Sequence, residues 1–146
     1  MNRRNALGIA VLVSIFSLAS SSLAQEAPYT EGSVWAISLI RVKTGMFDDY
    51  VKTLNDQTKK VYEQAKKEGL VLSYKVISAP AANRDDWNLM LMVEFKNMAA
   101  LDETDAKFRA INLKLFSQEQ QKKQVQARAE IREIIGDKLG RELILK

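Results

Sequence analysis

The stretch Asp86-Trp87-Asn88-Leu89-Met90-Leu91-Met92-Val93-Glu94-Phe95 is the most apolar run of the chain beyond residue 24. Alternation places an unbroken apolar series on one face of a strand: Trp87, Leu89, Leu91, Val93 and Phe95. The opposite face is polar only at its ends and carries Asn88, Met90, Met92 and Glu94. A strand with two apolar faces is normally covered on both sides. We therefore expect helices on one face and a second sheet, contributed by another subunit, on the other.

Two further segments are predicted to pair with this strand. Alternating side chains indicate a first strand over residues 34–43 and a second over residues 70–78. If the loop over residues 79–85 pairs Ser78 with Trp87, Lys75 lies opposite Met90. The first strand runs antiparallel and brings Arg41 beside Asn88 on the same face.

The apolar period changes to that of a helix at Met46, and the buried stripe continues to Ala65. Gly69 is predicted to be the left-handed residue that ends this helix. A second helix follows Asn97, whose side chain suits an N-cap. The segment 117–120 has capping-box spacing and restarts a helix over residues 118–135, which Gly136 ends. We expect the polar first half of that helix to be solvated, and a last strand over residues 139–145.

The predicted order is strand, helix, strand, strand, helix, strand, with the second helix doubled. This order is typical of the α+β ferredoxin-like fold, βαββαβ. Right-handed crossovers would give a four-stranded antiparallel sheet in the order 4-1-3-2. We predict a single domain over residues 34–146, with an extra long helix before the last strand, that forms a homodimer sheet to sheet.

The first 24 residues have the pattern of a signal peptide. Arg3 and Arg4 precede a short apolar run, and Ser22 and Ala24 supply the small residues that signal peptidase requires. We predict that the mature protein begins at Gln25, that residues 25–33 form a flexible arm, and that the protein is periplasmic or secreted. Once this leader is removed, we expect no membrane association.

Charge does not favour a nucleic-acid partner. The net charge of +4 falls to +2 when Arg3 and Arg4 are removed with the leader. The remaining lysines are interleaved with acids and form no single basic stripe. We therefore expect no nucleic-acid binding.

Two short motifs resemble those of the dimeric α+β barrel superfamily, which includes antibiotic-biosynthesis monooxygenase and stress-responsive barrel proteins. Arg41-Val42-Lys43-Thr44-Gly45, followed by Asp48-Asp49-Tyr50, resembles its strand-to-helix turn, with Thr44 in place of the usual proline. Phe95-Lys96-Asn97-Met98-Ala99-Ala100-Leu101 resembles its aromatic, cap and Ala-Leu junction. The resemblance covers about residues 34–101 and implies a fold, not an activity. The whole chain also resembles uncharacterised secreted bacterial proteins of this architecture.

The residue inventory excludes several kinds of chemistry. The chain has no histidine and no cysteine, which removes histidine-ligated haem, Ser-His-Asp triads and thiol chemistry. Asp85 and Asp86 are typical of a solvated turn rather than a metal site. We predict no catalytic residues, no metal and no cofactor.

The predicted pairing gives one candidate ligand site, on the face that we expect a second subunit to cover. Its residues are Arg41, Lys75, Asn88, Trp35 and Met90. Two cations beside an amide and apolar side chains would suit the acidic head of a small molecule. We expect Arg41, Lys75 and Asn88 to converge there, with Glu142 as the one carboxylate able to compete for the cations.

Three interpretations of function remain open. In the first, the barrel is filled by its own side chains and has no ligand. In the second, it binds a small apolar or acidic molecule. In the third, the protein is a cofactor-independent monooxygenase in which Trp35, Asn88 and Arg41 position an electron-rich aromatic substrate.

Overall fold

The computed structural model describes residues 26–146, so the predicted signal peptide lies outside the described residues. Four strands form one antiparallel sheet in the order β2-β3-β1-β4. They are β1 (Tyr29–Val42), β2 (Ser73–Ser78), β3 (Leu89–Phe95) and β4 (Arg132–Leu145). The strand order predicted from the sequence is confirmed, and the organising stretch supplies β3, next to the centre of the sheet.

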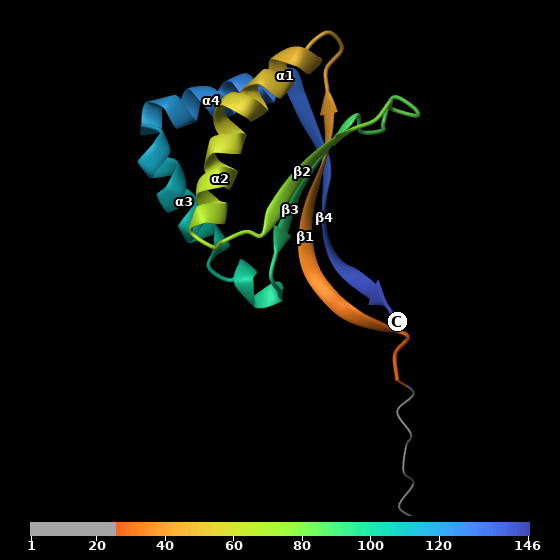
Figure 1. The fold of residues 1–146 in the computed structure, drawn as a ribbon. Coiled ribbons are helices and arrows are strands. Elements are labelled where there is room, and N and C mark those ends of the chain that lie inside the picture. The colour runs from red at the N-terminus through yellow and green to blue at the C-terminus, as the bar shows by residue number, and fades with distance from the viewer. Residues whose placement is uncertain (1–25) are drawn as a thin grey trace, which may run out of the picture.

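All helices of the described chain lie on one side of this sheet (Figure 1). The first helical segment is continuous and consists of α1 (Phe47–Thr53), a π-helical turn η1 (Leu54–Thr58) and α2 (Lys59–Lys67). After β3 come the 3₁₀ turn η2 (Met98–Leu101), α3 (Thr104–Leu115) and α4 (Gln118–Ile131). The fold is therefore α+β, with one face of the sheet covered by helices.

The structure contains three of the local features from which helix boundaries were predicted. Gly69 follows α2 with a φ of 70°, a left-handed conformation that glycine adopts without strain. The Asn97 side chain accepts a hydrogen bond from the Ala100 amide at 3.0 Å. Ser117 and Gln120 form the reciprocal capping box that starts α4.

The core lies between the sheet and the helices, in two clusters of buried side chains. One cluster surrounds Ile111 and includes Val34, Val93 and Phe95. The other surrounds Tyr50 and includes Ile40 and Leu89. Tyr50, Ile111 and Leu89 are completely buried. The strand residues of both clusters come from the helix-facing series of β1 and β3, as the alternation predicts.

The predicted pairing of β2 with β3 is wrong by two residues. Ser78 pairs with Leu89, not with Trp87, and Lys75 pairs with Met92. The loop is longer than expected because Asp86 belongs to it: its carboxylate accepts hydrogen bonds from the amides of Ala82 and Trp87, at 2.8 and 2.9 Å. A shift of two residues keeps every side chain on its predicted face.

The end of the chain also differs from the prediction. β4 begins at Arg132, so Gly136 lies within a strand and does not end a helix. Arg132 pairs with Val42, and a β-bulge follows where Leu39 pairs with Gly136 and Ile40 with Ile134. Local periodicity favoured helix here, but the exposed edge of the long strand β1 provides hydrogen-bond partners along the whole segment.

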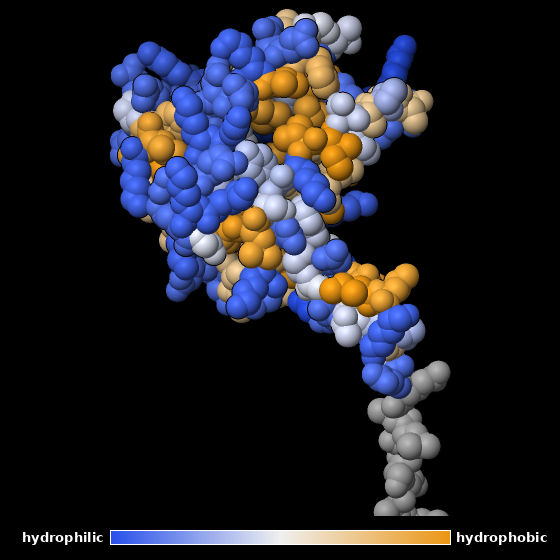
Figure 2. Space-filling model, in the orientation of Figure 1, coloured by the Kyte–Doolittle hydropathy of each residue, from blue (hydrophilic) through white to orange (hydrophobic). Residues whose placement is uncertain are grey.

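β1 also extends beyond the expected strand. It begins at Tyr29, so part of the predicted arm is paired with the end of β4, where Tyr29 lies opposite Leu145. The two strands continue past β3 as a ribbon (Figure 1). Figure 2 shows apolar surface at the free end of this ribbon, where Leu143, Ile144 and Leu145 are exposed.

Candidate functional site

The five residues predicted to form a ligand site do not converge. Arg41 lies at one end of the open sheet face, where its Nη2 is 2.8 Å from Glu133 Oε2 and its Nη1 is 3.8 Å from Asp85 Oδ1. It also donates a hydrogen bond to the Arg84 carbonyl. Glu133 raises the pKa of Arg41, and Arg41 lowers the pKa of Glu133. The positive charge of Arg41 is therefore balanced by carboxylates within the fold.

The other predicted residues are engaged separately. Lys75 lies over the ring of Trp35, 5.0 Å from its centroid. Asn88 Oδ1 accepts from the Val42 amide at 2.8 Å, and its Nδ2 donates to the Val42 carbonyl at 3.0 Å. These two bonds use the Asn88 side chain to hold the end of β1.

Two errors explain the missing convergence. The shifted register moves Lys75 from Met90 to Met92, two residues further along β3 and away from Arg41. The longer β4 brings Glu133 to Arg41, whereas the expected competitor, Glu142, accepts a hydrogen bond from Ser33 Oγ at 3.2 Å. Met90 pairs with Ile77 and with Leu39.

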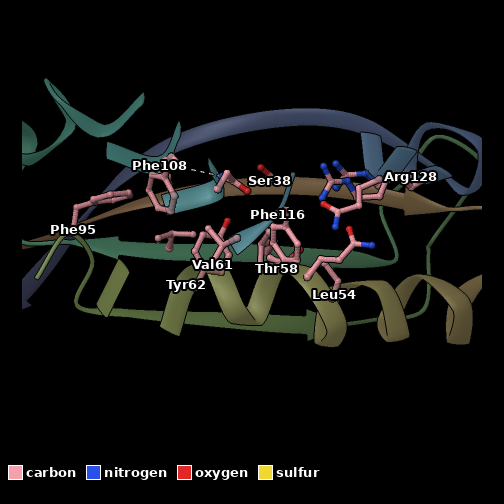
Figure 3. A pocket seen from close by; sticks show the side chains of 16 residues that line it. Ser38, Leu54, Thr58, Val61, Tyr62, Phe95, Phe108, Phe116 and Arg128 are labelled. Carbon is pink, nitrogen blue, oxygen red and sulfur yellow. Dashed lines mark hydrogen bonds between the residues drawn. The ribbon is translucent and has the colours of Figure 1, made fainter. Parts of the chain in front are cut away.

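A cavity of about 360 Å³ lies on the opposite side of the sheet, between the strands and the helices. Four aromatic side chains line it: Tyr62, Phe95, Phe108 and Phe116. Seven polar side chains also line it: Ser38, Gln57, Thr58, Asn112, Gln124, Arg128 and Arg132. In Figure 3, Phe95 and Phe108 lie at one end and Arg128 at the other, so the cavity has an apolar end and a cationic end.

The π-helical turn η1 supplies one wall of this cavity through Leu54, Gln57 and Thr58. Single π-helical turns inside α-helices are frequent at functional sites. The Gln57 Oε1 atom is buried and has no hydrogen-bond partner within the described chain. A buried acceptor without a donor is uncommon, and an ordered water or a bound polar group would satisfy it.

Arg128 and Arg132 form the cationic end. Arg128 lies in the last turn of α4 and Arg132 at the start of β4. The Arg132 Nη1 atom donates to Tyr50 Oη at 2.5 Å, and its guanidinium lies 5.3 Å from the centroid of the Tyr50 ring. Burial raises the pKa of Tyr50, and the positive charge of Arg132 opposes that shift.

Arg128 has no such partner. Its Nε atom is buried and makes no hydrogen bond to any residue from 26 to 146. Burial lowers the pKa of Arg128, and the neighbouring Arg132 lowers it further. No carboxylate is among the residues that line the cavity. The cationic end thus holds a guanidinium whose charge nothing in the described chain neutralises.

The aromatic side of the cavity is tightly packed. Tyr62 makes an edge-to-face contact with Phe108, with centroids 5.8 Å apart, and a tilted contact with Tyr74 at 5.2 Å. Burial raises the pKa of Tyr62 to about 12, so its hydroxyl is neutral at physiological pH. Tyr62 and Phe108 give the cavity an apolar wall, and Tyr74 supports Tyr62 from outside it.

Other hollows lie on the surface of residues 26–146. One of about 440 Å³ is lined mostly by polar and charged side chains of α2 and has no aromatic wall. A hollow of about 200 Å³ lies beside η1 and β2 and is lined largely by Val51, Leu54, Tyr74, Val76 and Leu91. It contributes to the apolar surface near α1 in Figure 2. Among residues 26–146 no group of acidic side chains could hold a metal ion, and no helix has the length and apolarity to cross a membrane.

Comparison with known proteins adds little. No family model matches the chain, and no curated protein matches it. Among solved structures, the crystal structure of HapK from Hahella chejuensis aligns with a TM-score of 0.49 and 15% sequence identity. The alignment covers 75% of this chain and 91% of HapK. A likeness at this level supports no conclusion about function.

The sequence contained a signal for the cavity that the prediction missed. Gln124, Arg128 and Arg132 recur every four residues and all line the cavity. The sequence interpretation treated residues 118–135 as a solvated helix with an apolar stripe at its end. A polar stripe at helical spacing, here Gln124 and Arg128, can also mark a side that faces a polar cavity, and only the packing of α4 against the sheet distinguishes the two cases. Arg132 lies beyond α4 and reaches the cavity as the first residue of β4.

Proposed function

We propose that the protein binds a small apolar or acidic molecule in the cavity between the helices and the sheet. The observation that carries this proposal is the cavity itself, which has an aromatic wall, a cationic end and two buried polar atoms without partners. Its volume of about 360 Å³ lies at the lower end of the ~300–1,000 Å³ that is usual for small-molecule sites. A ligand with one or two rings would suit it.

We further propose that the binding unit is a homodimeric α+β barrel of ferredoxin-like topology. The sheet face opposite the helices supports this proposal because it carries Trp35, Ile37, Leu39, Met90 and Met92. The helices of the described chain leave this face bare, and Ile77 on the neighbouring strand is 41% exposed. A second copy packed sheet to sheet would remove this apolar face from water.

Export to the periplasm or the medium also remains a proposal, since it depends on residues 1–24. Mass spectrometry of protein exported from a bacterial host should give the mass of a chain that begins at Gln25. Retention of Met1 in a membrane fraction would contradict removal of the leader.

The oxygenase interpretation depended on Trp35, Asn88 and Arg41 meeting around one substrate. Each of these side chains is engaged elsewhere, with Lys75, Val42 and Glu133 respectively. We therefore place ligand binding first.

A thermal-shift screen of small neutral and acidic aromatic compounds tests the binding proposal. A ligand at a hundredfold excess over Kd stabilises a protein by about 2.7 kcal/mol, which raises Tm by several degrees. The variant Ala36→Leu narrows the cavity, because Ala36 lines it, and should lose the shift. Ile37→Leu changes the adjacent residue on the opposite face of the sheet and serves as the control. If no compound shifts the Tm of the unaltered protein, the binding proposal is wrong.

A further inference from the structure

The cationic end of the cavity defines the class of ligand more narrowly, and this inference rests on the proposed binding function. We propose that the occupant is a small aromatic monocarboxylate whose carboxylate is held by Arg128 and whose ring lies against the aromatic end. The argument depends on the polarity of the cavity, on its charge and on the number of free guanidinium groups.

The polarity gives the orientation of the ligand. Phe95 and Phe108 lie at one end of the cavity and Arg128 at the other (Figure 3). Phe116 and Val61 lie between them. A ligand that is apolar throughout would leave Arg128 without a partner, and a ligand that is charged throughout would desolvate its charges against phenylalanine rings. A molecule with one apolar end and one anionic end is complementary to both ends of the cavity.

The charge of the cavity gives the sign of the ligand. Two arginines and no acidic residue line it. None of the ion pairs among residues 26–146 includes Arg128 or Arg132. Burial and mutual repulsion oppose the charged form of Arg128, which is why its pKa is lowered. An anion placed beside Arg128 would remove both penalties, whereas a cationic ligand would add a third charge of the same sign.

The hydrogen bonds of the two arginines indicate how many negative charges the ligand carries. Arg132 is already bonded to Tyr50 at 2.5 Å and lies over its ring. Arg128 is left with a buried N–H that has no partner among residues 26–146. One free guanidinium matches one planar carboxylate, because the two groups form parallel charge-assisted hydrogen bonds. The Gln57 amide, whose Oε1 has no hydrogen-bond partner within the described chain, can rotate to offer either its oxygen or its NH₂ to the same ligand.

Two probes of the same shape and different charge test the inference: 2-naphthoate and 2-naphthalenemethanol. Both fill the aromatic end, and only the first carries a carboxylate. Isothermal titration of the unaltered protein at pH 7 should show naphthoate binding about tenfold or more tighter, because hydrogen bonds to charged groups are the stronger ones.

Arg128→Gln should weaken naphthoate binding about tenfold to a hundredfold and leave binding of the alcohol unchanged. Arg128→Lys keeps the charge without the planar fork and should retain part of the preference. Arg109→Gln is the matched control, because Arg109 is exposed on α3 and does not line the cavity. Unchanged Tm values, or higher ones, in the Arg128 variants would show that loss of binding is not loss of folding.

The outcomes separate the two proposals. If naphthoate binds more tightly and Arg128→Gln removes that preference, the inference holds. If the alcohol binds as tightly as naphthoate, or Arg109→Gln has the same effect as Arg128→Gln, the inference is wrong while binding in the cavity stands. If neither probe binds at millimolar concentration and the broader screen also gives no shift, the proposed function itself is wrong.

Discussion

Arg128 should make the empty protein less stable than it could be. Its Nε is buried without a partner in the part of the chain that the structure describes, and Arg132 repels its charge. A buried polar group that lacks a hydrogen bond costs about 1–3 kcal/mol. Because the side chain as a whole is only half-buried, solvent reduces the penalty to the lower half of that range. Arg128→Met keeps most of the apolar stem and removes the charge, so we expect a stabilisation of about 1–2 kcal/mol.

Urea unfolding without ligand measures this effect, with all variants at one protein concentration because a dimer unfolds in a concentration-dependent way. The gain corresponds to a rise in Tm of about 3–8 °C for a domain of this size. Arg109→Met removes an exposed arginine and should change stability by less than about 0.5 kcal/mol. A loss of stability in Arg128→Met would refute the reasoning, since it would mean that Arg128 has a stabilising partner in the folded protein.

Three further predictions follow from other contacts. Met90→Asp places an unpaired charge on the open sheet face and should split the proposed homodimer, so that sedimentation velocity shows monomers; a persistent dimer would place the interface elsewhere. Asn88→Ala removes both hydrogen bonds to Val42 and should lower the free energy of unfolding by about 2–4 kcal/mol without changing ligand affinity. A loss of affinity at unchanged stability would instead show that Asn88 contacts the ligand. Burial raises the pKa of Tyr62 from 10.0 to about 12. The folded state therefore favours the neutral form of Tyr62, and the stability that depends on this neutral form is fully present below pH 10. It is lost as pH rises towards 12, at about 1.4 kcal/mol per pH unit. Tyr62→Phe should flatten this alkaline loss, and an unchanged pH profile would assign the loss to other groups.

The stability prediction and the ligand inference depend on each other in a useful way. A site that holds an unpaired charge ready for an anion is less stable when empty, which is a common trade-off between stability and function. Removing Arg128 should therefore raise stability and lower affinity for an aromatic acid. If Arg128 had only a structural role, its removal would lower the stability of the protein. The ratio of the affinities for the acid and the neutral probe would then stay unchanged.

Local chemistry was enough to predict much of the secondary structure. The cap at Asn97, the capping box at Ser117 and the left-handed Gly69 each depend on residues within four positions of one another. Alternation also assigned the faces of β1, β2 and β3 correctly, because the pleat of a strand fixes that period. The strand order followed from the order of the elements and the handedness of the crossovers.

Register and boundaries needed information that the local sequence does not hold. The hydrogen bonds of Asp86 lengthened the loop and displaced Lys75 by two residues along β3. The edge of β1 recruited residues 132–138, of which residues 132–135 had a pattern that favoured a helix. These two effects separated Lys75 from Arg41 and brought Glu133 to Arg41, so the predicted ligand site was lost.

The amino-acid sequence alone was enough to predict the class of the fold, the order of the strands and the faces of β1, β2 and β3. Those properties follow from short-range periodicity and from the geometry of the peptide chain. The position of the cavity depends instead on how the elements pack against one another. Arg128 and Arg132 reach it because α4 ends against the sheet and β4 begins there, which places residues distant in sequence from Tyr50, Gln57 and Phe95 around one space. That arrangement depends on how helices pack on a sheet, and no periodic pattern within one segment encodes it.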